Sequence, residues 1–179
     1  DTVADIEVIN TELVLADMDA VQRRKDKAEK NAKRGEKEAK AEVSLCEKLI
    51  PHFDEGKPAV TLELGDDERK LLKSFFLLTS KPCIFACNVA EADLASASND
   101  PDNHPFVGKV REYVKHAHEA TAVVVSAAIE SELIDLSDDD AKAYLADIGV
   151  TDSGVSRLIK GAYDLLGLNE RLDLVAAGA

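Results

Sequence analysis

Apolar residues recur at three- and four-residue steps through the first third of the chain. The two stripes contain Ile6, Ile9, Leu13, Ala16 and Ala20, and then Ala39, Val43, Cys46 and Ile50. Such spacing places side chains on one face of a helix, and Gly35 is the one helix breaker between the stripes. The pattern predicts a hairpin: a helix to about Arg34, a turn at Gly35, and an antiparallel return to about Leu49. Its distal part has few large apolar residues and is expected to project into solvent.

The hairpin is followed by signals for a helix end and a short helix. Pro51 and the segment Gly56-Lys57-Pro58 predict that the return helix ends or bends there. Asp66 begins an acidic first turn, which favours a helix to about Phe75. Residues 1–75 are therefore predicted to form a helical hairpin with a connecting short helix.

The periodicity changes in the second half of the chain. Residues 83–87 and 120–125 are continuously apolar, as is typical of strands buried on both faces, and they end at Asn88 and Ser126. The stretch 93–105 is rich in Ser, Asn, Asp and Pro and is predicted to be a loop, followed by an amphipathic helix from Phe106. Further helices are expected at 130–136, 137–148 and 153–166, with Ser137 as an N-cap.

Strand, helix, strand is the pattern of a βαβ unit, so the two strands are predicted to be parallel with a right-handed crossover. Two strands do not form a stable sheet by themselves. Further strands are therefore expected from elsewhere, and the absence of an initial Met also suggests a fragment. The predicted fold class is α/β, predominantly helical.

Composition narrows the function. The net charge of −13 argues against a general nucleic-acid binder. Residues 22–48 nevertheless carry ten Lys or Arg against six Asp or Glu, which fits either a docking surface or a solvated helical face. Three cysteines without framework spacing fit a reducing compartment, and no metal-ligand spacing is present. No membrane-spanning run or signal peptide is found, so a secreted protein is not expected.

Polar residues at the strand ends are the candidates for ligand binding. Asn88-Val89-Ala90-Glu91 follows the first strand, and Ser126-Ala127 follows the second. In open α/β sheets, ligands bind beyond the carboxyl ends of the strands. Asn-x-x-Glu alone is a weak motif, and the alternative role for Asn88 is to cap the loop at the strand end. The position of Asn88 after a buried strand, with Ser126-Ala127 after the next strand, makes the pattern more specific.

The chain resembles the YchF family of Obg-type P-loop ATPases in several collinear stretches: residues 5–13, 76–82, 88–91, 123–130 and 157–168. The resemblance implies a partial P-loop NTPase domain, Rossmann-like with a parallel sheet. Residues 76–168 would form its C-terminal half, and residues 1–75 a coiled-coil-type helical hairpin insertion. Residues 169–179 do not resemble the family and form an unassigned tail.

The resemblance also implies an adenine site and a preference for ATP over GTP. Asn88 would contact the adenine edge, Val89 would pack near the base, and Glu91 would orient the loop. Ser126 and Ala127 would approach the base from the other side. Glu130 is expected to cap its own helix rather than touch the ligand.

Members of the family are associated with ribosomes, which suggests ribosome or ribosomal RNA contact through the basic hairpin. The candidate residues are Arg23, Arg24, Lys27, Lys30, Lys33, Arg34 and Lys37. The bacterial cytoplasm and the plastid stroma both fit such a protein.

The chain lacks the Gly-x-x-x-x-Gly-Lys-Ser/Thr pattern that holds phosphates, and it lacks the switch segments. No catalytic residue is assigned for that reason. Hydrolysis and Mg²⁺ binding are expected only when a phosphate-binding segment is present. The alternative is a non-enzymatic helical binding or structural subunit that docks on a larger assembly through the basic hairpin.

Overall fold

The computed structural model describes residues 2–117 and 119–168. The tail 169–179 lies outside the described residues. Contacts divide the chain into two compact units, one of residues 3–81 and one that begins at Pro82.

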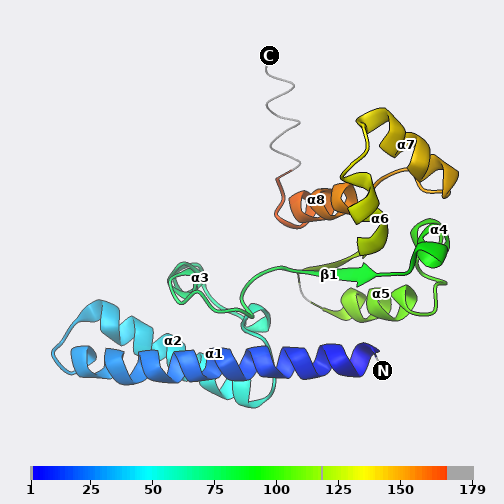
Figure 1. Ribbon diagram of the computed structural model, residues 1–179. Helices are drawn as coiled ribbons and strands as arrows, with labels where there is room; N and C mark the ends of the chain where they lie inside the picture. Colours follow the sequence, from blue (N-terminus) through cyan, green and yellow to red (C-terminus); the bar gives the residue numbers. More distant parts are fainter. Residues whose placement is uncertain (1, 118, 169–179) are drawn as a thin grey trace. The chain divides into compact units, whose positions relative to one another are not determined.

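The first unit is built on a helical hairpin (Figure 1). Helix α1 spans Thr2–Ala32 and α2 spans Lys37–Asp54. Gly35 occupies the turn between them with φ of +93°, a left-handed conformation that glycine adopts without steric cost. Ion pairs join the two helices, as between Arg24 and Glu42 at 2.9 Å. The predicted hairpin and its turn are confirmed.

The prediction that Pro51 ends or bends the return helix is wrong about the end, because Pro51 lies inside α2, which continues to Asp54. Proline removes a single backbone donor, and the buried side chains of Leu49 and Phe53 hold the helix on either side of it. The helix ends instead at Asp54, just before Gly56, whose φ is +73° and whose N–H donates to the Phe53 carbonyl at 2.8 Å.

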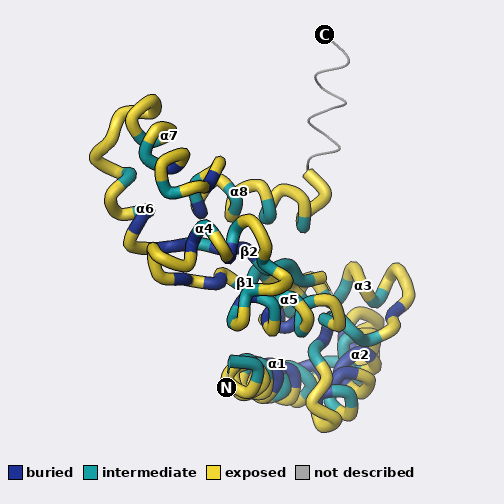
Figure 2. Tube along the Cα trace, turned by 90° about the vertical axis from the view of Figure 1, so that its right-hand side faces the viewer, coloured by how far each residue is buried: buried dark blue, intermediate teal, exposed yellow. Residues whose placement is uncertain are grey.

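The core of this unit lies between the hairpin and the segment that follows it (Figure 2). That segment contains a 3₁₀ turn at Ala59–Thr61 and helix α3 at Asp66–Lys73, which ends two residues before the expected Phe75. The core side chains come from α1, α2 and this segment: Val14, Val21, Leu45, Cys46, Leu49, Phe53, Ala59, Leu64 and Leu77.

Asp17 fastens the end of the unit to α1. Its carboxylate is only 3 % exposed. It accepts hydrogen bonds from the Leu78 N–H at 2.8 Å, the Thr79 N–H at 2.7 Å and the Thr79 hydroxyl at 2.7 Å. A buried carboxylate needs such donors to offset its lost hydration. Asp17 thus fixes the segment that leads to Pro82, where the second unit begins.

The second unit contains a two-stranded parallel sheet. Strand β1 spans Cys83–Asn88 and β2 spans Ala120–Val125, with Cys83 opposite Ala120 and Asn88 opposite Val125. Helices α4, Glu91–Asn99, and α5, Val107–His116, connect the strands. The predicted parallel βαβ unit is confirmed.

Two expectations about this unit are wrong. The predicted loop 93–105 contains most of α4, because Leu94 and Ala97 form a buried face and Glu91 and Asp93 provide an acidic first turn. The strands are also not buried on both faces throughout, since only Cys87, Val123 and Val124 are buried within them. Helices α5 and α8 cover opposite faces (Figures 1 and 2), but a sheet of two strands leaves much of each strand partly exposed.

Between β2 and Leu168, the structure contains α6 at Ala127–Leu133, α7 at Asp138–Asp147 and α8 at Gly154–Leu165. Ser137 caps α7 as predicted, accepting from the Asp140 N–H at 3.3 Å, and Ser153 accepts from the Ser156 N–H at 3.1 Å. In residues 2–117 and 119–168, no helix has the length and apolar character needed to cross a membrane.

Candidate functional site

The ends of the two strands meet through Asn88. Its Oδ1 accepts a hydrogen bond from the Ala127 N–H at 3.0 Å. The Val89 N–H donates to the Val125 carbonyl at 2.9 Å, extending the parallel pairing by one bond. This arrangement follows from the register, because Asn88 lies opposite Val125 and the next residue on each strand leaves the sheet at the same edge. Residues separated by 39 positions in the sequence therefore form one surface.

The side chains at this edge differ in what they can offer a ligand. Asn88 uses its amide oxygen internally, which leaves its NH₂ group on an exposed residue. Val89 is only 8 % exposed and its N–H is already bonded, so its remaining polar main-chain group is its carbonyl. Glu91 is exposed and is the first residue of α4, where its charge favours the helix N-terminus.

Ser126 is the most enclosed of the candidate residues. It is 1 % exposed, and its hydroxyl has no hydrogen-bond partner among the described residues. Buried hydroxyls almost always have a partner, so an unpaired one requires an explanation. Its carbonyl accepts from the Glu130 N–H at 2.9 Å, which starts helix α6.

Glu130 does not cap its own helix, so that expectation is wrong. Its carboxylate Oε1 accepts a hydrogen bond from the Gly154 N–H, the first residue of α8, at 2.5 Å. A side chain at the fourth position of α6 has passed the N-terminal donors of its own helix, whereas the donors of α8 lie within its reach. The two residues lie 24 positions apart in the sequence, with α7 between them, so their pairing depends on tertiary contacts.

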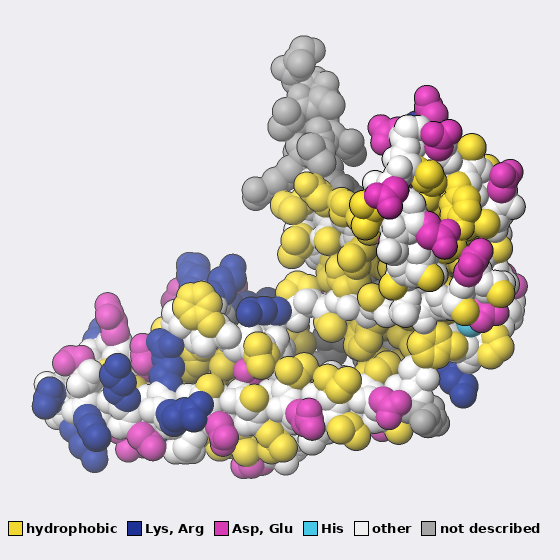
Figure 3. Space-filling view, in the orientation of Figure 1, with side chains coloured by type: hydrophobic (Ala, Val, Ile, Leu, Met, Phe, Trp, Pro, Cys, Tyr) yellow, Lys and Arg dark blue, Asp and Glu magenta, His cyan; other side chains and the backbone are white. Residues whose placement is uncertain are grey.

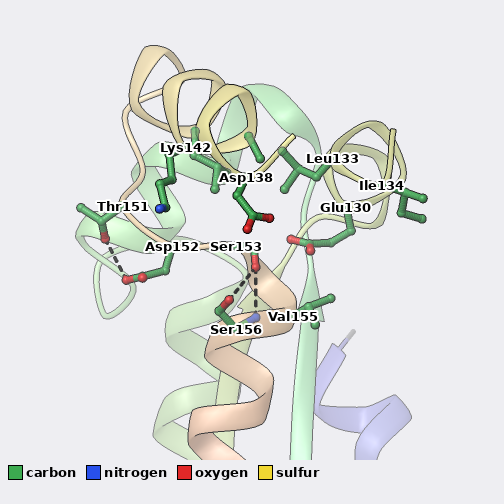
Figure 4. A pocket seen from close by; sticks show the side chains of 12 residues that line it. Glu130, Leu133, Ile134, Asp138, Lys142, Thr151, Asp152, Ser153, Val155 and Ser156 are labelled. Carbon is green, nitrogen blue, oxygen red and sulfur yellow. Dashed lines mark hydrogen bonds between the residues drawn. The ribbon is translucent and has the colours of Figure 1, made fainter. Parts of the chain in front are cut away.

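An open pocket of about 490 Å³ lies beside this contact, between α6, α7 and α8 (Figure 4). Its walls combine apolar side chains, such as Leu133 and Val155, with charged ones, such as Asp138 and Lys142. Figure 4 shows Glu130 pointing inward from α6. Asn88 and Ala127 are not among the lining residues, so this pocket is separate from the strand-end surface.

The seven candidate basic residues of the hairpin divide into two groups. Arg24 is engaged within its unit: it pairs with Glu42, donates to the Ser74 carbonyl at 2.9 Å and lies 4.0 Å from the centre of the Phe75 ring. The other six candidates are exposed: Arg23, Lys27, Lys30, Lys33, Arg34 and Lys37. Figure 3 shows Lys and Arg side chains gathered at one end of the hairpin. Of the seven candidates, these six present their charge to solvent.

Comparisons with known proteins give a consistent result, although no model of a protein family matches the chain. The chain is 40 % identical over 168 residues to the ribosome-binding ATPase YchF of Bacillus subtilis, covering 94 % of this chain and 44 % of that protein. It is 38 % identical over 164 residues to the protein of the same name in Pasteurella multocida, covering 92 % of this chain and 43 % of that protein.

A solved structure shares the fold. The YchF GTPase of Schizosaccharomyces pombe matches with a TM-score of 0.75 at 22 % identity, over 93 % of this chain and 44 % of that one. This confirms the expected P-loop NTPase fold, of which the described units are a part. The chain spans less than half the length of the curated relatives that it matches.

Proposed function

Because the chain belongs to the YchF family, we propose that it is part of a ribosome-associated, Obg-like ATPase that binds adenine nucleotide and prefers ATP to GTP. The chain supplies the base-binding half of the nucleotide site. The observation that carries the proposal is the bond between Asn88 Oδ1 and the Ala127 N–H, which joins the two strand-end segments into one surface. The compartment we propose is the bacterial cytoplasm or the plastid stroma.

In this site, the Asn88 NH₂ group donates to a ring nitrogen on the adenine edge, because its oxygen already holds Ala127. Val89 packs near the base and offers its carbonyl to the exocyclic amine of adenine, its N–H being used by Val125. Ser126 and Ala127 approach the base from the second strand. The Ser126 hydroxyl has no hydrogen-bond partner among the described residues, so it can donate or accept a hydrogen bond at this edge.

The preference against guanine rests on Glu91. A guanine clamp requires a carboxylate that accepts from both N1–H and the exocyclic amine of the base. Glu91 instead begins α4 and is exposed, where it orients the loop through the helix N-terminus. Adenine carries a lone pair at N1, which a carboxylate at that edge would repel. Loss of the clamp therefore removes a preference for guanine, and the contacts to adenine come from Asn88 and Val89.

Phosphate binding and hydrolysis require a segment with a phosphate-binding loop, which this sequence lacks. Within the described ranges, no group of three or more His, Cys, Asp or Glu side chains is placed to hold a metal ion. Base contacts alone give no transition-state stabilisation. We therefore expect the isolated chain to hydrolyse nothing, and the longer protein to hydrolyse ATP with bound Mg²⁺.

The test is ATP binding by the longer protein carrying Asn88→Ala. Loss of the side chain removes one base contact and frees Ala127, so the dissociation constant should rise about tenfold, which equals about 1.4 kcal/mol. Asn103→Ala is the matched control, because Asn103 is exposed and bonds only to the Asp100 carboxylate. Unchanged affinity in Asn88→Ala would remove the site assignment.

The hairpin is the proposed ribosome contact. Its exposed cations suit the phosphates of ribosomal RNA, and each phosphate contact makes binding weaker as salt rises. Arg24 contributes indirectly by holding α1 against α2 and the Ser74 turn. Charge reversal of Lys30 and Lys33 together should lower ribosome association and flatten its salt dependence.

A non-enzymatic docking module is the second candidate, favoured by the same exposed hairpin. It predicts hairpin-dependent association that does not respond to ATP. Ribosome co-sedimentation with and without ATP separates the two functions, because only the ATPase links nucleotide state to binding.

A further inference from the structure

We propose that Glu130 and Gly154 position the base-binding segment Ser126–Ala127. Glu130 would act as a positioning residue that fixes helix α6 against α8 without touching the nucleotide. The inference rests on the proposed function, since it concerns the same base site.

Helix α6 has little ability to hold its own position. It contains seven residues, too few for a stable helix in water. Its first residue, Ala127, is held by Asn88 on one side. Ile129 is fully buried, and Glu130 bonds the Gly154 N–H on the other side. These three attachments determine where the Ala127 N–H and the Ser126 hydroxyl lie.

Position 154 accepts only glycine without rearrangement. A Cβ added there would lie 3.0 Å from Glu130 Oε1 and 3.0 Å from both Cα and Cβ of Val125. The first residue of α8 is therefore pressed against the end of β2. Helix α8 packs closely on the same strand at Gly161, where an added Cβ would lie 3.1 Å from Val123 Cγ2. Helix α8 is thus a fixed support for the Glu130 bond.

A continuous series of contacts surrounds the base-binding segment. It runs from Asn88 to Ala127, along α6 to Glu130, across to Gly154, and through α8 to the end of β2, which pairs with β1. Removing the Glu130 side chain takes away the bond from α6 to the start of α8, while Asn88 and the buried Ile129 still hold the start of α6. The Ala127 N–H then loses its fixed direction while the strands remain intact.

The charge of Glu130 strengthens this link, because a carboxylate at a helix N-terminus interacts favourably with the helix dipole. An amide oxygen retains the hydrogen bond but not the charge. Glu130→Gln should therefore preserve the position of α6, whereas Glu130→Ala should not. Gly154→Ala should resemble Glu130→Ala, since its methyl group displaces the carboxylate.

The experiment measures the affinity of the longer protein for two ligands. ATP uses the base site, whereas inorganic tripolyphosphate uses only the phosphate site. Glu130→Ala and Gly154→Ala should each weaken ATP binding about tenfold, which corresponds to the loss of one charge-assisted hydrogen bond. Neither substitution should change the affinity for tripolyphosphate. Glu130→Gln should stay within about twofold of the parent protein. Glu132→Ala is the matched control: this exposed glutamate on the same helix accepts from the Tyr144 hydroxyl, and its loss should leave ATP affinity unchanged.

A double-mutant cycle gives the decisive comparison. If Glu130 acts through Ala127, adding Glu130→Ala to Asn88→Ala should cost little more than Asn88→Ala alone. Equal losses for ATP and tripolyphosphate, or full additivity in the cycle, would overturn the inference. If Asn88→Ala weakens ATP while Glu130→Ala and Gly154→Ala do not, only the positioning role fails. If Asn88→Ala has no effect either, the proposed base site itself fails.

Discussion

Replacement of the buried Asp17 by alanine tests the account of the first unit. Asp17 accepts three hydrogen bonds at 2.7–2.8 Å from the segment at Leu78 and Thr79. A hydrogen bond to a charged group contributes about 1.5–3 kcal/mol, and the three share one carboxylate, so their effects do not add. Removing the carboxylate also removes its desolvation cost. The expected net loss is about 3 kcal/mol of unfolding free energy.

Urea unfolding followed by circular dichroism measures this loss for the helical unit. Hydrogen exchange locates it, because the Leu78 and Thr79 amides should lose protection before those of the hairpin. Asp19→Ala is the control, since Asp19 is exposed on the same helix and its removal makes the same charge change. Its effect should stay within about 0.5 kcal/mol. A loss below about 1 kcal/mol in Asp17→Ala, equal to an ordinary surface contact, would refute the reasoning.

Three further outcomes follow from burial and pairing. Ile129→Ala should destabilise the second unit by about 2–5 kcal/mol in thermal or urea unfolding, because Ile129 is fully buried. Burial raises the pKa of the Cys46 thiol from 9.0 to about 11. The contribution of this thiol to the free energy of unfolding is therefore fully present below pH 9 and is lost as the pH rises towards 11. Iodoacetamide should accordingly modify the exposed Cys83 in the native protein, and Cys46 only after unfolding, as mass spectrometry can show. Arg24→Ala should lower the melting temperature because Arg24 bridges Glu42 and Ser74, whereas Arg23→Ala should leave it unchanged.

The features predicted from the sequence depend on local pattern. The hairpin follows from apolar spacing and one glycine, and the two strands from short apolar runs that end at Asn88 and Ser126. The cap at Ser137 follows from a hydroxyl before acidic residues. Each needs only residues a few positions apart, for which backbone geometry is decisive.

The features that were missed depend on residues distant in sequence. Helix α4 has a polar, loop-like composition, and it forms because Leu94 and Ala97 are buried beneath it. Nothing near Glu130 indicates that its partner is the backbone of Gly154. In the sequence, Asp17 cannot be distinguished from other charged residues on the helix, because its partner Thr79 lies far along the chain. These features depend on tertiary contacts between residues far apart in the sequence, and local sequence patterns do not predict such contacts.

The two-stranded sheet has consequences for the solution behaviour of the isolated chain. Among the described residues, each strand pairs on one edge only, so the other edge retains unpaired N–H and C=O groups. Such edges are templates for pairing with a second molecule. The net charge of −13 opposes this association by mutual repulsion, and dissolved salt screens it. The colloidal stability of the purified chain should therefore decline as ionic strength rises, and a protein with neighbouring strands on these edges should not show this sensitivity.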